Sequence, residues 1–156
     1  MKTIFLSFTP EPFYEPMKQG LKRYEYRTRF TSEECMAYLY LSSPIQKVVA
    51  KIKFGLRIEL PYWEEKFKDD KEAMKRLRAF FKEGKNFAIP ILEFQEIEPV
   101  PLTELQSKFE NFKVPRSYFF LDNQPEVLNY LNSIPMKGEK LIHNLAEIDG
   151  NEVCIY

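Results

Sequence analysis

The sequence predicts an α+β fold built by one domain. Segments that alternate between apolar and polar residues come in runs near the N-terminus, and they are not each followed by a helix, as they would be in a parallel α/β sheet. Segments with apolar residues three and four positions apart come later. The 156 residues match the size of a single domain, and 14 Phe and 9 Tyr supply enough apolar surface for one core.

The first thirty residues predict a strand, a helix and a second strand. Residues 2–8 alternate as a strand. Thr9 is a candidate N-cap with Pro10 at the first helical position, and Gly20 suits the left-handed residue that ends a helix. Residues 22–30 alternate strictly as the second strand. One face of this strand carries four charged side chains, which are Arg23, Glu25, Arg27 and Arg29.

The chain up to residue 134 continues this mixture of strands and helices. Strands are expected at 36–41 and 46–54, separated by the turn-forming triplet Ser42-Ser43-Pro44. Apolar residues at helical spacing on a charged background predict a helix at 70–82. The remaining predicted elements are a strand at 86–97, an extended aromatic segment at 116–121 and helices at 102–109 and 124–134.

The last residues are expected to extend the same domain. Residues 1–134 form the predicted domain, and Pro135-Met136-Lys137-Gly138 is the first linker-like stretch. Asp149-Gly150 is a favoured hairpin turn between two apolar alternations. We therefore expect residues 135–156 to form a hairpin that packs on the domain.

The composition excludes several kinds of chemistry. Cys35, Cys154 and His143 cannot supply the four ligands of a structural zinc, so no metal is expected. The five glycines are too far apart for a dinucleotide-binding or phosphate-binding loop, so no cofactor is expected. The first apolar stretch is too short for a signal peptide or a membrane span. We therefore expect a cytoplasmic protein with reduced thiols that does not bind membranes.

Charge is unevenly divided along the chain. Lys plus Arg and Asp plus Glu both number 23, which argues against a protein that coats polyanions. Residues 1–57 nevertheless hold ten cations, five carboxylates and five tyrosines. A surface for single-stranded nucleic acid needs cations for phosphates and aromatic faces for unstacked bases. The alternative is an ordinary domain with tyrosines in the core and solvated charges.

The charged strand face singles out Lys22, Glu25 and Arg27. Arg27 lies roughly 6–7 Å along the strand from Glu25, close enough to pair with the carboxylate and keep it ionised. Lys22 precedes them, and repulsion by neighbouring cations would lower its pKa and make it a usable base. The alternative is an exposed edge strand protected by its charges.

Several separated motifs resemble ASCH domains, of the PUA-like superfamily. Residues 6–11 followed by 20–27 resemble the family's opening strand and helix and its G-x-K-x-x-E-x-R signature. Residues 38–50 are similar to the strand, turn and strand that close the cleft. Residues 86–94 and 114–121 resemble a later barrel strand and a P-x-S-aromatic segment. The resemblance implies a PUA-like mixed β-barrel with peripheral helices and a cleft lined by the signature strand.

ASCH domains are thought to bind RNA or nucleotides, so the resemblance implies a module that binds RNA or a nucleotide or nucleobase, with a regulatory role. On this interpretation Glu25 accepts hydrogen bonds from the ligand, Arg27 orients Glu25 or holds a phosphate, and Lys22 contacts phosphate. A tyrosine, Tyr14 or Tyr40, stacks on the base. The candidate binding residues are Lys22, Arg23, Glu25, Arg27, Ser42, Ser43, Tyr14, Tyr40, Arg116, Ser117 and Tyr118.

A second hypothesis is an enzyme, because some small bacterial ASCH proteins are amidohydrolases that deacylate an acetylated cytidine with a Lys, a Thr and a Glu. By this resemblance Lys22 falls on the catalytic Lys, as the base, and Glu25 stands where those enzymes have Thr, which removes a hydroxyl. Lys22 and Glu25 are the catalytic candidates if the protein is an enzyme. The hydrolase Glu would be one of Glu64, Glu65, Asp69, Asp70 and Glu72. A third hypothesis is that residues 135–156 bind a protein partner.

Overall fold

The structure is a computed structural model that describes residues 1–145 and 147–156. The strands in this part of the chain are β1 (Lys2–Phe8), β2 (Tyr24–Arg27), β3 (Cys35–Leu41), β4 (Lys47–Phe54), β5 (Ile58–Glu59), β6 (Phe87–Pro101), β7 (Tyr118–Phe120) and β8 (Met136–Ile142). The helices are α1 (Tyr14–Lys18), α2 (Leu60–Lys66), α3 (Lys71–Lys82), α4 (Leu102–Lys108) and α5 (Pro125–Asn132), with short 3-10 helices η1 (Leu121–Asn123) and η2 (Gly150–Glu152).

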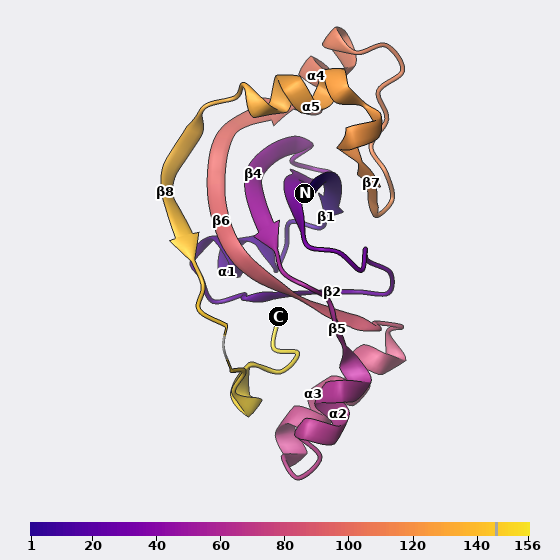
Figure 1. Ribbon diagram of the computed structural model, residues 1–156, viewed down its shortest axis with the longest axis vertical. Coiled ribbons are helices and arrows are strands. Elements are labelled where there is room, and N and C mark those ends of the chain that lie inside the picture. The colour runs from indigo at the N-terminus through magenta and orange to yellow at the C-terminus, as the bar shows by residue number, and fades with distance from the viewer. Residues whose placement is uncertain (146) are drawn as a thin grey trace.

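A curled mixed sheet forms the centre of the molecule (Figure 1). Its strand order is β2-β6-β4-β3-β1-β7, and β5 and β8 also pair with β6. β1 and β3 run parallel, and the other paired strands run antiparallel. In Figure 1, α4 and α5 lie at one end of the molecule and α2 and α3 at the other. This arrangement confirms the predicted α+β class and a barrel-like curvature of the sheet.

The alternation of β1 explains how the sheet buries both of its faces. Ile4 and Leu6 enter one apolar cluster, and Phe5, between them, enters a second cluster that includes buried residues of α4 and α5. Successive side chains of a strand point to opposite faces, so a strand covered on both sides buries all of them. A third cluster packs Trp63 of α2 and Leu77 of α3 against β2.

Helix α3 has the predicted range to within one residue, because its N-cap and its apolar residues both lie where the sequence pattern places them. The Asp70 carboxylate accepts a hydrogen bond from the Ala73 N–H at 3.1 Å, which satisfies one of the free donors of the first turn. Ala73, Met74 and Leu77 are buried on one side of the helix. Near the C-terminal end of α3, the Phe80 ring packs edge-on against the Tyr26 ring of β2, with 4.8 Å between the ring centres.

Three sequence-based expectations about local structure are wrong. Helix α1 does not start at Thr9, because Pro12 disfavours a helical conformation of the residue before it, and 11–13 form a turn instead. The second strand ends at Arg27 and does not continue to residue 30. Asp149-Gly150 is not a hairpin turn, since the Asp149 carboxylate accepts a hydrogen bond from the Asn151 N–H and starts η2.

The predicted C-terminal extension joins the main sheet through β8, which pairs with β6. Gly20, at φ +79°, turns the chain after α1, as the sequence predicted for the end of that helix. Within the described ranges, none of the helices has both the length and the apolarity needed to cross a membrane.

Candidate binding cavity

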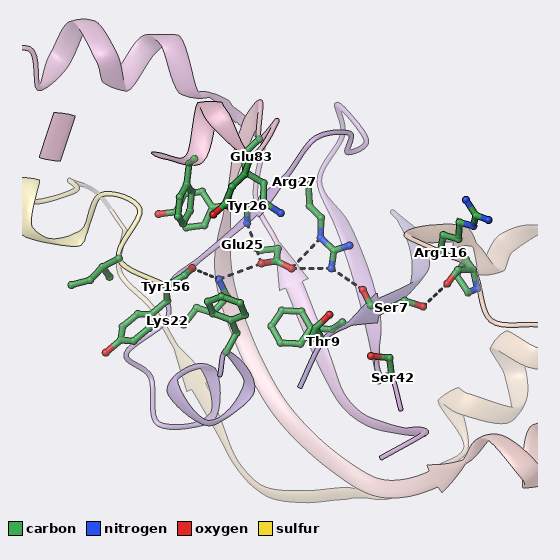
Figure 2. A pocket seen from close by; sticks show the side chains of 16 residues that line it. Ser7, Thr9, Lys22, Glu25, Tyr26, Arg27, Ser42, Glu83, Arg116 and Tyr156 are labelled. Atoms are coloured by element: carbon green, nitrogen blue, oxygen red, sulfur yellow. Dashed lines mark hydrogen bonds and ion pairs between the residues drawn. The ribbon is translucent and has the colours of Figure 1, made fainter. Parts of the chain in front are cut away.

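A cavity of about 530 Å³ opens beside β2, where the carboxyl ends of the parallel strands β1 and β3 meet (Figure 2). Ser7 of β1 lines the cavity, as do Thr9, directly after β1, and Ser42, directly after β3. Its volume lies within the range of pockets that hold small organic ligands.

The floor of the cavity is a buried ionic network formed by Glu25 and Arg27 of β2 and by Lys22, which lies just before this strand. Glu25 is only 6% exposed and Lys22 only 2%. Glu25 Oε1 lies 3.2 Å from Lys22 Nζ and accepts a hydrogen bond from the Tyr26 N–H at 3.0 Å. Glu25 Oε2 accepts two hydrogen bonds from Arg27, from Nε at 3.0 Å and from Nη2 at 2.9 Å. Both carboxylate oxygens therefore already hold two partners each.

Lys22 has no free proton in this network. Its Nζ donates to the main-chain oxygens of Tyr24 and Tyr156, both at 2.8 Å, and faces Glu25 with its third proton. A lysine ammonium has three donors, and all three are engaged. The main-chain oxygen of Tyr156 thus takes up one of the three donors of Lys22.

Burial and neighbouring charges together shift the pKa of both central groups. Burial lowers the pKa of Lys22, and Arg27 and Lys85 lower it further, while Glu25 opposes the shift. The direction predicted from the sequence is confirmed, although burial outweighs like-charge repulsion as its cause. Burial would raise the pKa of Glu25, but Lys22, Arg27 and the Tyr26 N–H together leave it below its usual value. Glu25 is therefore an ionised carboxylate, as predicted.

Three cationic groups around the cavity remain available. Arg27 Nη2 donates to the Ser7 carbonyl at 2.8 Å as well as to Glu25, whereas its Nη1 has no partner in the described part of the chain. The side chains of Lys85 and Arg116 likewise form no hydrogen bond or ion pair with any described residue, and both line the cavity. These three groups can donate to an anion without breaking an internal contact.

The loop that carries Arg116 is held against β1 by main-chain contacts. The Ser7 N–H donates to the Ser117 carbonyl at 2.9 Å, and the Ser7 hydroxyl donates to the Pro115 carbonyl at 2.7 Å. Figure 2 shows Lys22 and Tyr156 at one end of the cavity, Arg116 at the other, and Glu25 and Arg27 between them. At the end of the cavity with Lys22 and Tyr156, the donors of Lys22 are all engaged. At the other end, Arg116 has no partner among the described residues.

The C-terminal segment, residues 150–156, contributes Ile155 and Tyr156 to one wall of the cavity. Arg76 donates to the carbonyls of Val153 at 2.7 Å and Gly150 at 2.6 Å, and the Tyr26 hydroxyl accepts from the Cys154 N–H at 3.0 Å. Val153 and Cys154 are buried, whereas the next two residues line the cavity. Hydrogen bonds to main-chain atoms therefore position this wall.

The structure brings some of the predicted site residues together and separates others. Lys22, Glu25, Arg27, Ser42 and Arg116 line the cavity. The other six predicted binding residues do not, and they are Arg23, Ser43, Tyr14, Tyr40, Ser117 and Tyr118.

The separated residues have partners elsewhere. Arg23 pairs with Glu152 at 2.7 Å, and the Tyr14 hydroxyl donates to Glu96 at 3.2 Å. Tyr40 is buried in the cluster beneath α4 and α5, and Tyr118 packs against Phe30. Tyr14 and Tyr40 therefore offer no stacking surface inside the cavity.

None of the five acidic candidates at 64–72 lines the cavity. Asp70 instead caps α3. Glu83, directly after α3, lines the cavity instead. The sequence pattern does not predict this residue. Phe13, Phe80, Lys85, Ile155 and Tyr156 also line the cavity without having been predicted as site residues.

Comparisons with known proteins find similarity of fold. Neither protein-family models nor curated proteins match the sequence. Among solved structures, the crystal structure of ASCH from Zymomonas mobilis is similar with a TM-score of 0.65 and 20% identity, over 85% of this chain and 96% of that one. Two mutants of the same protein are similar with TM-scores of 0.61 at 19% and 17% identity, over 83% and 86% of this chain and 96% and 99% of theirs.

The chain therefore has the fold of ASCH domain proteins. This confirms at the level of the fold the resemblance that the sequence motifs predicted. The curled sheet with helices at either end is the arrangement that the chain shares with these structures.

Proposed function

We propose that the cavity binds a phosphate-bearing nucleotide, either free or within a short single-stranded RNA segment. The observation that carries this proposal is the charge of the lining. Four cations, which are Lys22, Arg27, Lys85 and Arg116, stand against two carboxylates, Glu25 and Glu83. Guanidinium and ammonium groups around a concave site favour an anionic ligand, and phosphate is the anion that nucleotides present.

Aromatic side chains support a base as the second part of the ligand. Phe8, Phe13, Tyr26 and Phe80 line the same cavity. Aromatic faces bind unstacked bases without requiring a particular sequence. In this proposal Arg116 and Arg27 Nη1 hold the phosphate, and an aromatic wall receives the base.

In this proposal Lys22 and Glu25 have a different role from the one expected. Since their donors and acceptors are engaged, they orient Arg27 and set the local charge. A ligand oxygen reaches Lys22 only by replacing the main-chain oxygen of Tyr156. Binding of a ligand at Lys22 therefore requires residues 155–156 to move.

A titration with uridine 5′-monophosphate and with uridine, followed by amide NMR signals, tests this function. We expect both to shift signals of cavity residues, and the monophosphate to bind about tenfold more tightly, because charge-assisted hydrogen bonds to the phosphate are worth about 1.5–3 kcal/mol. Equal affinities, or shifts confined to residues outside the cavity, would contradict the proposal.

A second candidate function is hydrolysis of an acylated nucleoside amine. What favours it is the burial of Lys22, which lowers its pKa, together with the presence of Glu83 in the same lining. This reaction requires Lys22 first to lose the proton that faces Glu25. The neutral amine then accepts a proton from water, the water oxygen bonds to the acyl carbon, and Lys22 returns that proton to the nitrogen as the C–N bond breaks.

Incubation with N4-acetylcytidine, with product analysis by chromatography, separates the two functions. Release of cytidine and acetate that is lost in Lys22→Met and kept in Lys113→Met favours the enzyme. Binding of uridine monophosphate without turnover of the acylated nucleoside favours the binding module.

A further inference from the structure

A second, smaller hollow lies away from the cavity, on the face of the sheet that carries Tyr38. It has a volume of about 120 Å³ and is lined by residues of β3, β4, β6 and β8. It shares no lining residue with the cavity. Binding of a ligand in the hollow would therefore be independent of binding in the cavity.

The strand register places the lining side chains on one face. Lys51 is directly opposite Tyr38 and Gln95, and Lys53 is directly opposite Met36 and Glu93. Directly paired residues of antiparallel strands point to the same side of a sheet. Tyr38 is covered, and its hydroxyl donates to Asn132 of α5 at 2.6 Å. The hollow thus begins where the layer of α4 and α5 ends.

Lysines dominate the charge of this hollow. Lys51, Lys53 and Lys140 line it together with the single carboxylate of Glu93. Glu93 is 3.8 Å from Lys140, which is too far for a hydrogen bond. Lys51 and Lys53 are half-buried and have no carboxylate partner among the described residues.

Lys51 is held in an unfavourable position for a cation. Its Nζ lies 5.2 Å from the centre of the Tyr38 ring, which offers partial compensation. Burial lowers the pKa of Lys51, and the neighbouring Lys140 lowers it further. An anion between the two ammonium groups would remove this repulsion.

We infer that the hollow formed by Lys51, Lys53 and Lys140 binds a phosphate group. Its size accommodates a tetrahedral oxyanion and is smaller than the roughly 300–1,000 Å³ of pockets for drug-sized ligands. Lysine binds phosphate as a point charge with rotatable donors, so three lysines can share the oxygens of one group. The amide Nε2 of Gln95 already donates to the Gly138 carbonyl at 2.9 Å and helps to fix the rim.

An NMR titration with inorganic phosphate, matched in ionic strength with sodium chloride, tests the inference. With ¹³C-labelled lysines, we expect saturable shifts of the Lys51, Lys53 and Lys140 side-chain signals with phosphate and none with chloride. Lys51→Met and Lys140→Met should each weaken binding by about tenfold, because each removes one charge-assisted contact. Lys137→Met is the matched control, since Lys137 is exposed on β8 and does not line the hollow.

Thermal unfolding of each variant shows whether it is folded, and Lys140 is exposed enough to be replaced without disturbing the core. A uridine octamer in a second titration distinguishes the sources of the phosphate group. Shifts of the same lysine signals identify a nucleic-acid backbone, and shifts with phosphate alone identify the free ion. Shifts that grow equally with chloride, or equal weakening by Lys137→Met, would overturn the inference.

Discussion

Arg27 donates two hydrogen bonds to a single oxygen of Glu25, from Nε at 3.0 Å and from Nη2 at 2.9 Å, although the two residues are only two positions apart on β2. The same Nη2 also donates to the Ser7 carbonyl at 2.8 Å. The guanidinium therefore links the end of β1 to β2, and its Nη1 has no partner among the described residues. Glu25 is in this way the centre of the cavity floor.

Replacement of Glu25 by Gln should destabilise the protein. The amide removes the negative charge that two neighbouring cations share in a buried site, and breaking a buried pair costs about 3–5 kcal/mol. The free energy of unfolding from urea denaturation measures this effect. Glu98→Gln, at an exposed position of β6, should change it by no more than about 0.5 kcal/mol. Equal stability of Glu25→Gln and the parent would show that the network contributes nothing.

The pH dependence of stability should show an acid limb due to Glu25. Its pKa in the folded protein is lower than its ordinary value of 4.5, so the unfolded chain takes up the proton first as the pH falls. Stability is thus fully present above about pH 4.5 and is lost as the pH falls toward the pKa of the folded state. Denaturation midpoints between pH 3 and pH 7 should fall more steeply in the parent than in Glu25→Gln. Glu98→Gln, as the control, should keep the limb of the parent. A limb of equal steepness in Glu25→Gln would assign it to other carboxylates.

Loss of the Arg76 guanidinium should release the C-terminal wall of the cavity. Arg76→Met removes both hydrogen bonds to the carbonyls of Val153 and Gly150, and each such bond to a charged donor is worth about 1.5–3 kcal/mol. Hydrogen exchange of amides at 150–156 should become faster, since their protection depends on this local structure. Arg78→Met, an exposed position on the same helix, is the control and should leave exchange unchanged. Unchanged protection in Arg76→Met would mean that the buried side chains alone hold the segment.

The regular elements could be predicted because their patterns are local. The alternation of β1 and the apolar spacing and N-cap of α3 are readable within a few residues, and both elements have the predicted bounds to within one residue. The pairing of Arg27 with Glu25 was also predictable, since two positions along a strand point to the same face.

The rest of the site depends on contacts between distant parts of the chain. Arg23 was expected on the same face as Glu25, but Glu152, which is 129 positions away, draws it outside the cavity. Glu83 and Tyr156 reach the cavity only because α3 and the C-terminal segment fold back against β2. No local pattern signals such contacts, so the sequence does not single out Glu83, and the resemblance places the Glu of the hydrolase hypothesis at residues 64–72, which do not line the cavity.

Binding of a fluorescein-labelled uridine octamer to the parent, Arg116→Met and Lys113→Met tests the proposed function most directly. Arg116 lines the cavity without an internal partner, and Lys113 is an exposed cation near it in sequence that does not line the cavity. Fluorescence anisotropy at several salt concentrations should show about tenfold weaker binding for Arg116→Met. The slope of log K against log salt should fall by about 0.7 for that variant and not for Lys113→Met. Absence of binding by the parent, or equal affinity and slope for the parent and Arg116→Met, would contradict the assignment of the cavity to a nucleotide phosphate.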